Sequence, residues 1–287
     1  MKTKRIIESV IHAIFLILGL ITVACVLLIS IYLIVAGIPA ISKIGIVKFL
    51  FGTKWAPTYA SPEYGIMPFI LASIYGTCGA IVIGVPIGFF CAIYLSKVAS
   101  KKVKNIVGHA ISMLAGIPSV VYGLVGMLIL VPGIRKIFHV PDGSSLLAAM
   151  IVLAIMILPS IIKVSITSLD AVPKEYEDAS LALGANEIET YFRVSVTAAK
   201  SGIITSIVLG VGRAIGEAMA VMMVSGNVPN MPKLFESVRF LTTAVASEMS
   251  YAAGLQRQAL FSIALVLFVF IILINACLNL FLNKETK

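Results

Sequence analysis

The sequence predicts an all-α fold, a polytopic bundle of six transmembrane helices. Of its 287 residues, 60% are hydrophobic and only 12% are charged, whereas soluble domains carry about 25% charged residues. The apolar residues also gather in segments long enough for a bilayer core, which needs ~20 residues per helix. We expect spans at about residues 10–37, 66–96, 106–131, 145–166, 201–225 and 258–282.

The first span follows a short basic terminus, "MKTKR" (1–5). Secretory signal peptides share this arrangement, but their apolar core is only about 7–15 residues long. The apolar run from Val10 to Gly37 is much longer. We therefore expect an uncleaved membrane helix.

The distribution of Lys and Arg predicts the orientation. Six spans place both termini on one side of the membrane. Of the 22 Lys and Arg residues, 13 fall on that side, eight on the other, and Arg213 within the fifth span. The bias is strongest in the short stretch "SKVASKKVKN" (96–105). Because basic residues accumulate in cytoplasmic loops, both termini are expected in the cytoplasm.

The fifth span contains two opposite charges. "GVGRAIGEAMAV" (210–221) places Arg213 and Glu217 one helical turn apart near the middle of the membrane. An Arg at the bilayer centre costs at least about 2.5–3.5 kcal/mol, and an i,i+4 ion pair returns only about 0.2–0.5 kcal/mol. An Arg–Glu bridge that fixes helix packing is one interpretation. An anion pathway explains the cost better, because the planar donor fork of Arg suits phosphate and carboxylate oxygens.

Two roles for Glu217 stay open. It can hold Arg213 in place, so that an anion is not bound too tightly for release. Alternatively, its carboxylate can accept a hydrogen bond from a protonated oxygen of the substrate, since an ionised carboxylate only accepts. Hydrogen phosphate carries such a proton and sulfate does not, so this second role would disfavour sulfate.

The stretch "AGIPSVVYG" (115–123) predicts a broken helix. Pro and Gly are tolerated in membrane helices when neighbouring groups satisfy the freed backbone. Ser119 and Tyr122 would then line the same pathway, and plain packing of the bundle is the alternative. The GxxxG spacings Gly84–Gly88 and Gly212–Gly216 predict close approach of helices.

The connection 167–200 is predicted to hold two short helices. Pro173 suits the first turn of one helix, Gly184 suits its end, and Asn186 with Glu189 forms an N-cap pair for the second. The segment 175–189 carries five acidic residues and no basic one. Because an anionic leaflet would repel this charge, we expect a protein partner instead.

The stretch "DASLALGANEIETYFRVSVT" (178–197) resembles the EAA loop of ABC importer permeases. Asp replaces the usual Glu, Ser replaces an Ala, and Thr197 stands where the family usually has a proline. The positions that keep the family spacing are Asp178, Ala179, Ser180 and Gly184. The resemblance implies that they dock into a groove on a cytoplasmic ATPase and transmit its motion.

The chain itself is not expected to be an enzyme. It contains no G-x-x-x-x-G-K-[ST] phosphate-binding loop. We predict no catalytic residue, no metal site and no cofactor of its own, with ATP–Mg bound by the partner ATPase.

From about residue 40 onward, the chain resembles the PstC-type permeases of phosphate ABC importers. The resemblance implies a type I (MetI-like) importer fold, with an N-terminal helix and outer loop (1–65), then a five-helix core (66–287) that contains the coupling loop at about 167–200. In that family, the counterparts of Arg213 and Glu217 are associated with phosphate translocation. The stretches that carry it are "WAP" (55–57), "YGIMPFILASIYGT" (64–77), "AGIPSVVYGLVGML" (115–128), "GVGRAIGEAMAV" (210–221) and "FESVRFLTTAVASEMSY" (235–251).

The same resemblance implies partners and a location. We expect a heterodimer with a PstA-type sister permease, two copies of a cytoplasmic ABC ATPase, and an extracytoplasmic phosphate-binding protein. The assembly would lie in the lipid of a prokaryotic cell membrane and would have no nucleic-acid partner.

Other functions fit the sequence differently. A permease for another oxyanion shares the same features. A secondary anion transporter often shows internal repeats, which the sequence lacks. An intramembrane enzyme would need a motif such as HExxH or GxSxG, and a scaffold would leave Arg213 unexplained. The connection 226–257 is expected outside the cell with a helix in "VRFLTTAVASEM" (238–249), and periodicity leaves open whether it re-enters the membrane.

Overall fold

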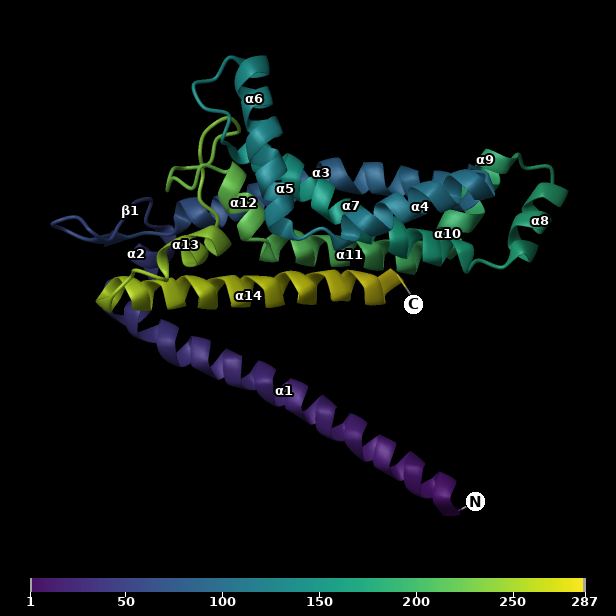
Figure 1. The fold of residues 1–287 in the computed structure, drawn as a ribbon, viewed down its shortest axis with the longest axis horizontal. Helices are drawn as coiled ribbons and strands as arrows, with labels where there is room; N and C mark the ends of the chain where they lie inside the picture. Colours follow the sequence, from purple (N-terminus) through teal and green to yellow (C-terminus); the bar gives the residue numbers. More distant parts are fainter. Residues whose placement is uncertain (1, 286–287) are drawn as a thin grey trace.

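The computed structural model describes the backbone of residues 2–285 and the side chains of residue 8 and residues 10–277. Figure 1 shows an elongated helical bundle, from which α1 (Lys2–Ile44) diverges toward the N-terminus. A two-stranded antiparallel ribbon, β1 (Trp55–Ala56) and β2 (Glu63–Tyr64), lies at one end of the bundle. The expected all-α fold is confirmed.

Most helices follow one another with short connections, apart from the stretches between α2 and α3 and between α12 and α13. After α1 and α2 (Ile46–Phe51), the first half of the core contains α3, α4, α5, α6 and α7, and the second half contains the helices from α8 to α14. Three π-helical turns, η1, η2 and η3, continue α3, α5 and α9. The bounds are α3 (Met67–Ile93), η1 (Tyr94–Val98), α4 (Lys101–Gly116), α5 (Ser119–Val125), η2 (Gly126–Leu130), α6 (Val131–Phe138), α7 (Leu146–Asp170), α8 (Lys174–Ala182), α9 (Glu187–Thr190), η3 (Tyr191–Ser195), α10 (Val196–Ala198), α11 (Lys200–Gly216), α12 (Met219–Val224), α13 (Leu241–Glu248) and α14 (Gly254–Glu285).

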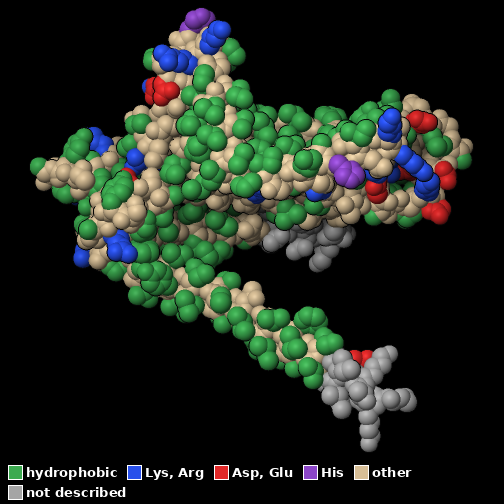
Figure 2. Space-filling view, viewed as in Figure 1, with side chains coloured by type: hydrophobic (Ala, Val, Ile, Leu, Met, Phe, Trp, Pro, Cys, Tyr) green, Lys and Arg blue, Asp and Glu red, His purple; other side chains and the backbone are tan. Residues whose placement is uncertain are grey.

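Five helical segments of the described chain are long and apolar enough to cross a membrane, and a bent pair makes a sixth. Figure 2 shows hydrophobic side chains along the bundle and charged side chains mainly toward its ends, as expected for a membrane-spanning body. The single segments are Val10–Ile44, Met67–Val98, Ser119–Phe138, Leu146–Asp170 and Gly254–Cys277, and the pair is Glu187–Ala198 with Lys200–Gly216, bent by 72°.

Two of the expected spans are wrong as continuous helices. The segment 106–131 is interrupted after Gly116, and the spanning helix runs instead over Ser119–Phe138. The segment 201–225 is interrupted after Gly216. The break expected in 115–123 from its Pro and Gly residues is confirmed. Hydrophobic content could not reveal the break after Gly216, because the residues on either side of it are equally apolar.

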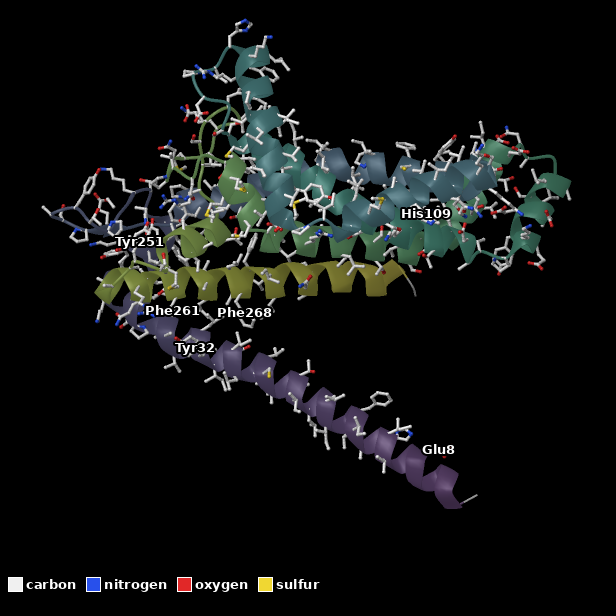
Figure 3. The ribbon with its side chains drawn as sticks, viewed as in Figure 1. Glu8, Tyr32, His109, Tyr251, Phe261 and Phe268 are labelled. Atoms are coloured by element: carbon white, nitrogen blue, oxygen red, sulfur yellow. The ribbon has the colours of Figure 1, made fainter. Side chains whose placement is uncertain are left out.

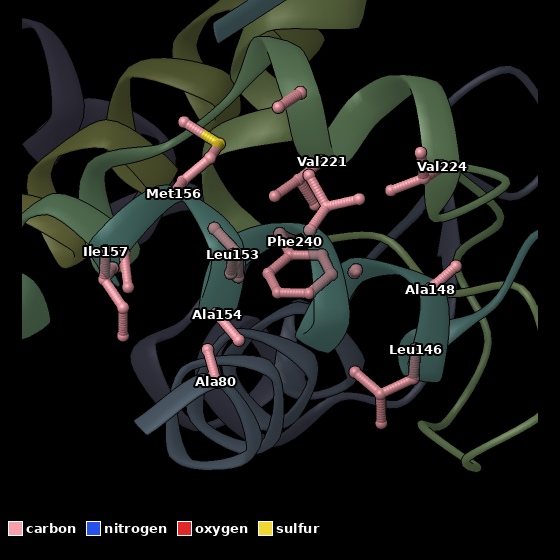
Figure 4. Packing of buried hydrophobic residues seen from close by; sticks show 14 of the residues in the cluster. Ala80, Leu146, Ala148, Leu153, Ala154, Met156, Ile157, Val221, Val224 and Phe240 are labelled. Carbon is pink, nitrogen blue, oxygen red and sulfur yellow. The ribbon is translucent and has the colours of Figure 1, made fainter. Parts of the chain in front are cut away.

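Helices α3 and α7 form the centre of the bundle. Gly84 and Gly88 of α3 let α7 approach so closely that an added Cβ would lie 2.9 Å from Ile157 and 2.8 Å from Ile161. The predicted close contact at this GxxxG spacing is therefore confirmed. Figure 4 shows the core between these helices and α12, with the Phe240 ring among Leu153, Val221 and their neighbours.

Helix α11 packs antiparallel to α7, and this packing fixes the depth of the site. A Cβ on Gly202 would contact Ser168, the Ser206 hydroxyl lies 2.9 Å from that of Ser165, and a Cβ on Gly210 would lie 3.2 Å from Ile161. The next turn of α11 after Gly210 contains Arg213. The same register places this turn beside the middle of α7.

Helix α1 contacts the bundle through one end only. Gly37 approaches α14 so closely that the Ser262 hydroxyl donates to the Gly37 carbonyl over 2.5 Å. Figure 3 shows Tyr32 beside Phe261, whose rings meet edge-on with centroids 5.5 Å apart. Toward the N-terminus, the apolar side chains of α1 are exposed, which suits a helix surrounded by lipid.

Candidate anion pathway and coupling loop

Two helices are broken side by side within the bundle. The chain is extended at Ile117 and Pro118, between the end of α4 and the start of α5. It is extended again at Glu217, between α11 and α12. Non-helical backbone at membrane depth is tolerated only where protein buries it or where it lines a water-filled cavity. The paired breaks are therefore either packed within protein or line a water-filled pathway, and only the second case would give them a transport role.

The packing of α5 on α12 brings the two breaks to the same level. A Cβ on Gly123 would lie 2.8 Å from the Ala220 Cα, and one on Gly126 would lie 2.8 Å from Val224. From Gly123 to Gly126 along α5, the contacted residue moves from Ala220 to Val224 along α12, so the two helices run parallel. The starts of α5 and α12, directly after the two breaks, therefore lie at the same end of this contact.

Arg213 lies in the last turn of α11, beside the middle of α7. Its side chain is half-buried. Within the described part of the chain, no hydrogen bond or ion pair involves its guanidinium group. The guanidinium is close enough for its charge to act on the Tyr122 hydroxyl. Arg213 thus presents an unused donor fork inside the bundle.

Glu217 does not share a helical face with Arg213, so that expectation is wrong. Helix α11 ends at Gly216, and the extended backbone of Glu217 directs its carboxylate toward α12, where Oε1 accepts a hydrogen bond of 3.0 Å from the Ala220 amide. The Thr242 hydroxyl donates to the Glu217 carbonyl over 2.8 Å. The Arg–Glu bridge and the proposed restraint of Arg213 are therefore absent from this conformation.

Tyr122 secures the other break. Its hydroxyl donates to the Leu114 carbonyl over 2.7 Å, which satisfies one of the acceptors that the end of α4 leaves free. The structure thus places Tyr122 within reach of the Arg213 charge, from two separate broken helices. A role of Arg213, Glu217, Ser119 and Tyr122 toward a substrate stays a prediction.

One side of α11 is open. Among the described residues, a Cβ on Gly212 or Gly216 would meet no atom beyond its own helix within 4 Å, and the same holds at Gly116 before the first break. The close helix contact predicted at Gly212–Gly216 does not occur within this chain. The side that carries these glycines is free for a substrate or for another protein.

The coupling loop, residues 167–200, has the two predicted helices. Pro173 precedes α8, Gly184 ends it with a φ of +90°, and Asn186 and Glu189 form the capping box of α9. The Ser180 hydroxyl lies 2.9 Å from that of Thr190, which links the two helices.

The outer surface of the coupling loop is apolar and acidic. Asp178, Ala179 and Gly184 are exposed, and Leu183 exposes 91% of its surface. Tyr176, Leu181 and Ile188 of the same loop are also exposed, and several exposed apolar side chains on one loop indicate a protein partner. Docking of an ATPase through Asp178, Ala179, Ser180 and Gly184 stays a prediction.

The family follows from a comparison with known proteins. Residues 84–284 match the family described as "Binding-protein-dependent transport system inner membrane component". The chain belongs to this family. It is a multi-pass membrane permease.

Curated relatives of the permease extend the match over most of its length. It is 38% identical over 90% of its length to the "Probable ABC transporter permease protein YqgH" of Bacillus subtilis, covering 86% of that protein. It is 34% identical over 96% of its length to the "Phosphate transport system permease protein PstC" of Haemophilus influenzae, covering 92% of it. The PstC of Pasteurella multocida is also 34% identical, over 84% of the permease and 81% of the relative.

Solved structures show the same fold. An inward-facing structure of the MetNI methionine ABC transporter matches 78% of the permease and 95% of its own chain, with a TM-score of 0.58 and 17% identity. An amino acid ABC transporter matches 76% of the permease and 92% of its own chain, with a TM-score of 0.54 and 20% identity. The expected type I importer fold is confirmed.

Sequence reasoning missed the contacts that hold the coupling loop of the permease. The Lys97 ammonium group donates to Glu177 Oε1 over 2.5 Å and to the Leu169 carbonyl over 3.0 Å, and the Ser195 hydroxyl donates to the same Glu177 oxygen over 2.7 Å. We call Lys97, Glu177 and Ser195 the loop clamp. The short basic stretch at 96–105 and the acidic run at 175–189 were its only sequence signals.

A second set of contacts reinforces the loop clamp from the same basic stretch. Asp170, at the end of α7, accepts from the Ser96 hydroxyl over 2.6 Å and from the Lys104 ammonium group over 2.7 Å. The stretch 96–104 therefore binds both Asp170, where α7 ends, and Glu177, in α8.

Sequence reasoning also missed a buried polar network at the opposite end. Glu248 is buried; it forms an ion pair with Arg239 and accepts hydrogen bonds from the Trp55 indole over 3.2 Å and from the Gln256 amide over 2.9 Å. The network joins the connection 226–257 to the β-ribbon. The helix expected over 238–249 is shorter, at Leu241–Glu248, because Val238 is held in a bridge with Gly226.

The connection 226–257 dips back into the bundle. Phe240 inserts its ring against Gly76 of α3 in the core, and the Leu241 amide donates to the Ser73 hydroxyl over 3.0 Å. The contact between Thr242 and Glu217 places the start of α13 directly beside the second break. Part of this connection therefore lies at the level of the second helix break, and its re-entry into the membrane stays a prediction.

Proposed function

We propose that the chain is the permease subunit of an ATP-driven phosphate importer. The observation that carries this proposal is Arg213, a permanently charged donor fork without a partner in the described chain, between two helix breaks beside the middle of α7. Such a charge is costly inside a membrane, and a visiting anion compensates it. The names of the PstC relatives support phosphate as that anion.

Each of the four pathway residues has a separate role in the proposed transport site. Arg213 donates paired hydrogen bonds to two oxygens of the anion. Glu217 keeps one oxygen on the Ala220 amide and offers the other to the proton of hydrogen phosphate. Tyr122 and Ser119 supply hydroxyls beside them. Because no carboxylate of the described residues competes for the fork of Arg213 in this conformation, its full charge is available to the anion.

The open side of α11 is the place of the sister permease. A PstA-type partner would pack near Gly212 and Gly216 and close the pathway with its own residues. A phosphate-binding protein would deliver the anion at the end that carries the β-ribbon. The coupling loop and both termini would lie in the cytoplasm of a prokaryotic cell, as the Lys and Arg distribution indicates.

The exposed coupling loop is the docking site for the ATPase. Two ATPase copies, one for each permease, would bind ATP–Mg, so this chain needs no cofactor. The loop clamp would pass their motion to the end of α3, because Lys97 belongs to the turn that continues that helix.

The proposal is tested by reconstituting the full assembly in lipid vesicles. We expect ATP-dependent, vanadate-sensitive uptake of phosphate. Arg213→Gln should lower this uptake about tenfold or more, because it removes a charge-assisted contact that contributes about 1.5–3 kcal/mol. Arg135→Gln, an exposed change on α6, is the matched control and should leave uptake unchanged.

Three results would contradict parts of the proposal. Uptake by this chain alone, driven by an ion gradient, would indicate a secondary anion transporter. Preferential ATP-driven uptake of another oxyanion would retain the importer and correct its substrate. Full phosphate uptake by Arg213→Gln at equal assembly levels would remove Arg213 from the pathway.

A further inference from the structure

A second basic feature lies far from Arg213, at the end of the bundle that carries the β-ribbon. A cavity of about 600 Å³ opens there between the end of α1, α2, the ribbon and the start of α14. Figure 2 shows basic side chains near the junction of α1 and α14. Three lysines and a single acidic residue line the cavity: Lys43, Lys48, Lys54 and Glu63.

The positive charge of this cavity is poorly compensated. Lys54 lies 3.9 Å from Glu63, and both side chains are largely exposed. The Lys43 ammonium group reaches only a neutral amide oxygen, of Gln258, at 3.5 Å. Among the described residues, Lys48 has no hydrogen bond or ion pair. Two of the three ammonium charges therefore lack a counterion within the described chain, and an anion in the cavity would reduce their mutual repulsion.

The wall of the cavity is firmly built. Gly52 and Gly65 cross so closely that a Cβ on Gly65 would lie 2.3 Å from the Gly52 carbonyl carbon. The Gly65 amide donates to the Lys54 carbonyl over 2.8 Å, and the Ile66 amide donates to the Phe49 carbonyl over 2.9 Å. These bonds join α2 and the ribbon to the start of α3, so the lysines stand on a fixed frame.

The cavity lies where a membrane helix leaves the hydrocarbon core. The apolar span of α1 ends at Ile44, directly after Lys43. The next helix, α2, exposes Ile46, Val47 and Phe51 beside Lys48. A short helix with exposed apolar side chains and a lysine, directly after a membrane span, is suited to the headgroup region.

We propose that this cavity binds the phosphate group of an anionic phospholipid. The three ammonium groups surround the headgroup phosphate, and the acyl chains lie along the exposed apolar residues of α1 and α2. Free inorganic phosphate has the same chemistry, but the apolar rim favours the lipid. An acidic protein surface would gain less from this rim. The proposal depends on the membrane position of α1 and not on the transported substrate.

The test measures lipid retention on the purified assembly. Native mass spectrometry would count phosphatidylglycerol and phosphatidylcholine molecules bound to the wild type and to Lys43→Gln/Lys48→Gln/Lys54→Gln. We expect the triple variant to lose about tenfold or more in apparent affinity for phosphatidylglycerol, because each basic residue near an anionic lipid contributes about 1 kcal/mol. Phosphatidylcholine binding should stay unchanged.

A matched control removes the same charge outside the cavity. Arg135→Gln/Lys136→Gln/Lys233→Gln changes exposed residues of α6 and of the connection after α12, and it should keep phosphatidylglycerol binding. The single variant Lys48→Arg keeps the charge and should also retain the lipid. If the control loses as much lipid as the cavity variant, or if the cavity variant loses none, the proposal is wrong.

Two further arms separate the other ligands. Equilibrium dialysis with radiolabelled inorganic phosphate, on the assembly in detergent, would overturn the lipid assignment if the cavity variant loses phosphate while it keeps phosphatidylglycerol. A weaker association with the binding protein, with lipid retention unchanged, would assign the lysines to a protein partner and would equally overturn it.

Discussion

The ammonium group of Lys97 lies 2.5 Å from Glu177 Oε1, and this contact joins the end of α3 to α8 of the coupling loop. Both side chains are largely buried, with exposed fractions of 10% and 20%. Removing one partner of a buried pair leaves the other charge unsatisfied. The connection between a spanning helix and the coupling loop is therefore firm, and it can carry motion in either direction.

Glu177→Gln is expected to loosen the coupling loop without unfolding the bundle. The change removes the charge of a hydrogen-bonded pair and should cost about 1–3 kcal/mol. We expect fewer phosphate ions transported for each ATP hydrolysed, and faster proteolysis of residues 167–200. Glu175→Gln is the matched control, because Glu175 is exposed in the first turn of the same helix. An unchanged transport ratio in Glu177→Gln would show that the loop clamp does not couple.

The loop clamp also predicts a dependence on pH. Burial raises the pKa of Glu177, but the hydrogen bonds from Lys97 and Ser195 and the charge of nearby lysines outweigh burial and hold this pKa below its ordinary value of 4.5. A carboxyl group with a lowered pKa stabilises the fold fully above its ordinary pKa and loses this contribution as pH falls through the lowered value.

The coupling loop should therefore resist proteolysis equally well from pH 7 down to about pH 5 and lose protection only below the ordinary pKa of a Glu side chain. A protease active in acid, such as pepsin, provides the measurement at the low end. Glu177→Gln should be less protected at neutral pH and should show little further change in acid. The same acid-dependent loss in both proteins would assign it to other groups.

Glu217 can be tested in two parts, because one oxygen caps α12 and the other is free to meet a substrate. Glu217→Gln keeps an oxygen for the Ala220 amide, so it should preserve stability but lower the preference for phosphate over sulfate. Glu217→Ala removes the cap as well and should cost about 1 kcal/mol, as the loss of a helix cap does. Thermal unfolding measures the change in stability, and competition uptake measures the change in preference. Unchanged discrimination in Glu217→Gln would rule out recognition of the substrate proton.

The glycines of α3 and α11 should respond in opposite ways. Gly88→Ala drives a methyl group into Ile161 and should destabilise the permease by about 1–3 kcal/mol. Gly212→Ala meets no atom beyond its own helix in the part of the chain that the structure describes, so the fold of this chain should tolerate it or gain up to about 1 kcal/mol from helix propensity. Transport should nevertheless fall in Gly212→Ala if the sister permease packs there. Thermal unfolding and uptake, measured on both variants, would separate the two cases, and normal uptake in Gly212→Ala would place the sister permease elsewhere.

Sequence patterns located the spans and the coupling loop because both rest on local physics. Long apolar runs must lie in lipid, and the signals at Gly184 and Asn186 act within a few residues. Of the two helix breaks, the one at Ile117–Pro118 was predicted and the one at Glu217 was not. The first has a proline, whereas at the second no residue forbids a helix, and the chain leaves it because Thr242 and Ala220 bind Glu217 from outside the helix.

The sequence alone also could not show which charged side chains form ion pairs. Arg213 and Glu217 are four residues apart and do not meet, whereas Lys97 and Glu177 are 80 residues apart and do. Sequence spacing predicts contact only when the helix is known to continue. The partners of Glu248 come from three separate segments, and only the packed structure brings them together.

Both partners that donate to Glu177 lie on π-helical turns, Lys97 in η1 and Ser195 in η3. Such a turn usually accommodates one extra residue in a helix, and each added residue turns the remainder of the helix by roughly 100°. Deleting one residue before Lys97 would restore a plain helix and rotate the ammonium group away from Glu177, with every named side chain still present. The ion pair thus depends on the number of residues before Lys97 as well as on the two side chains. A one-residue gap there in an aligned permease would indicate that the ion pair is lost.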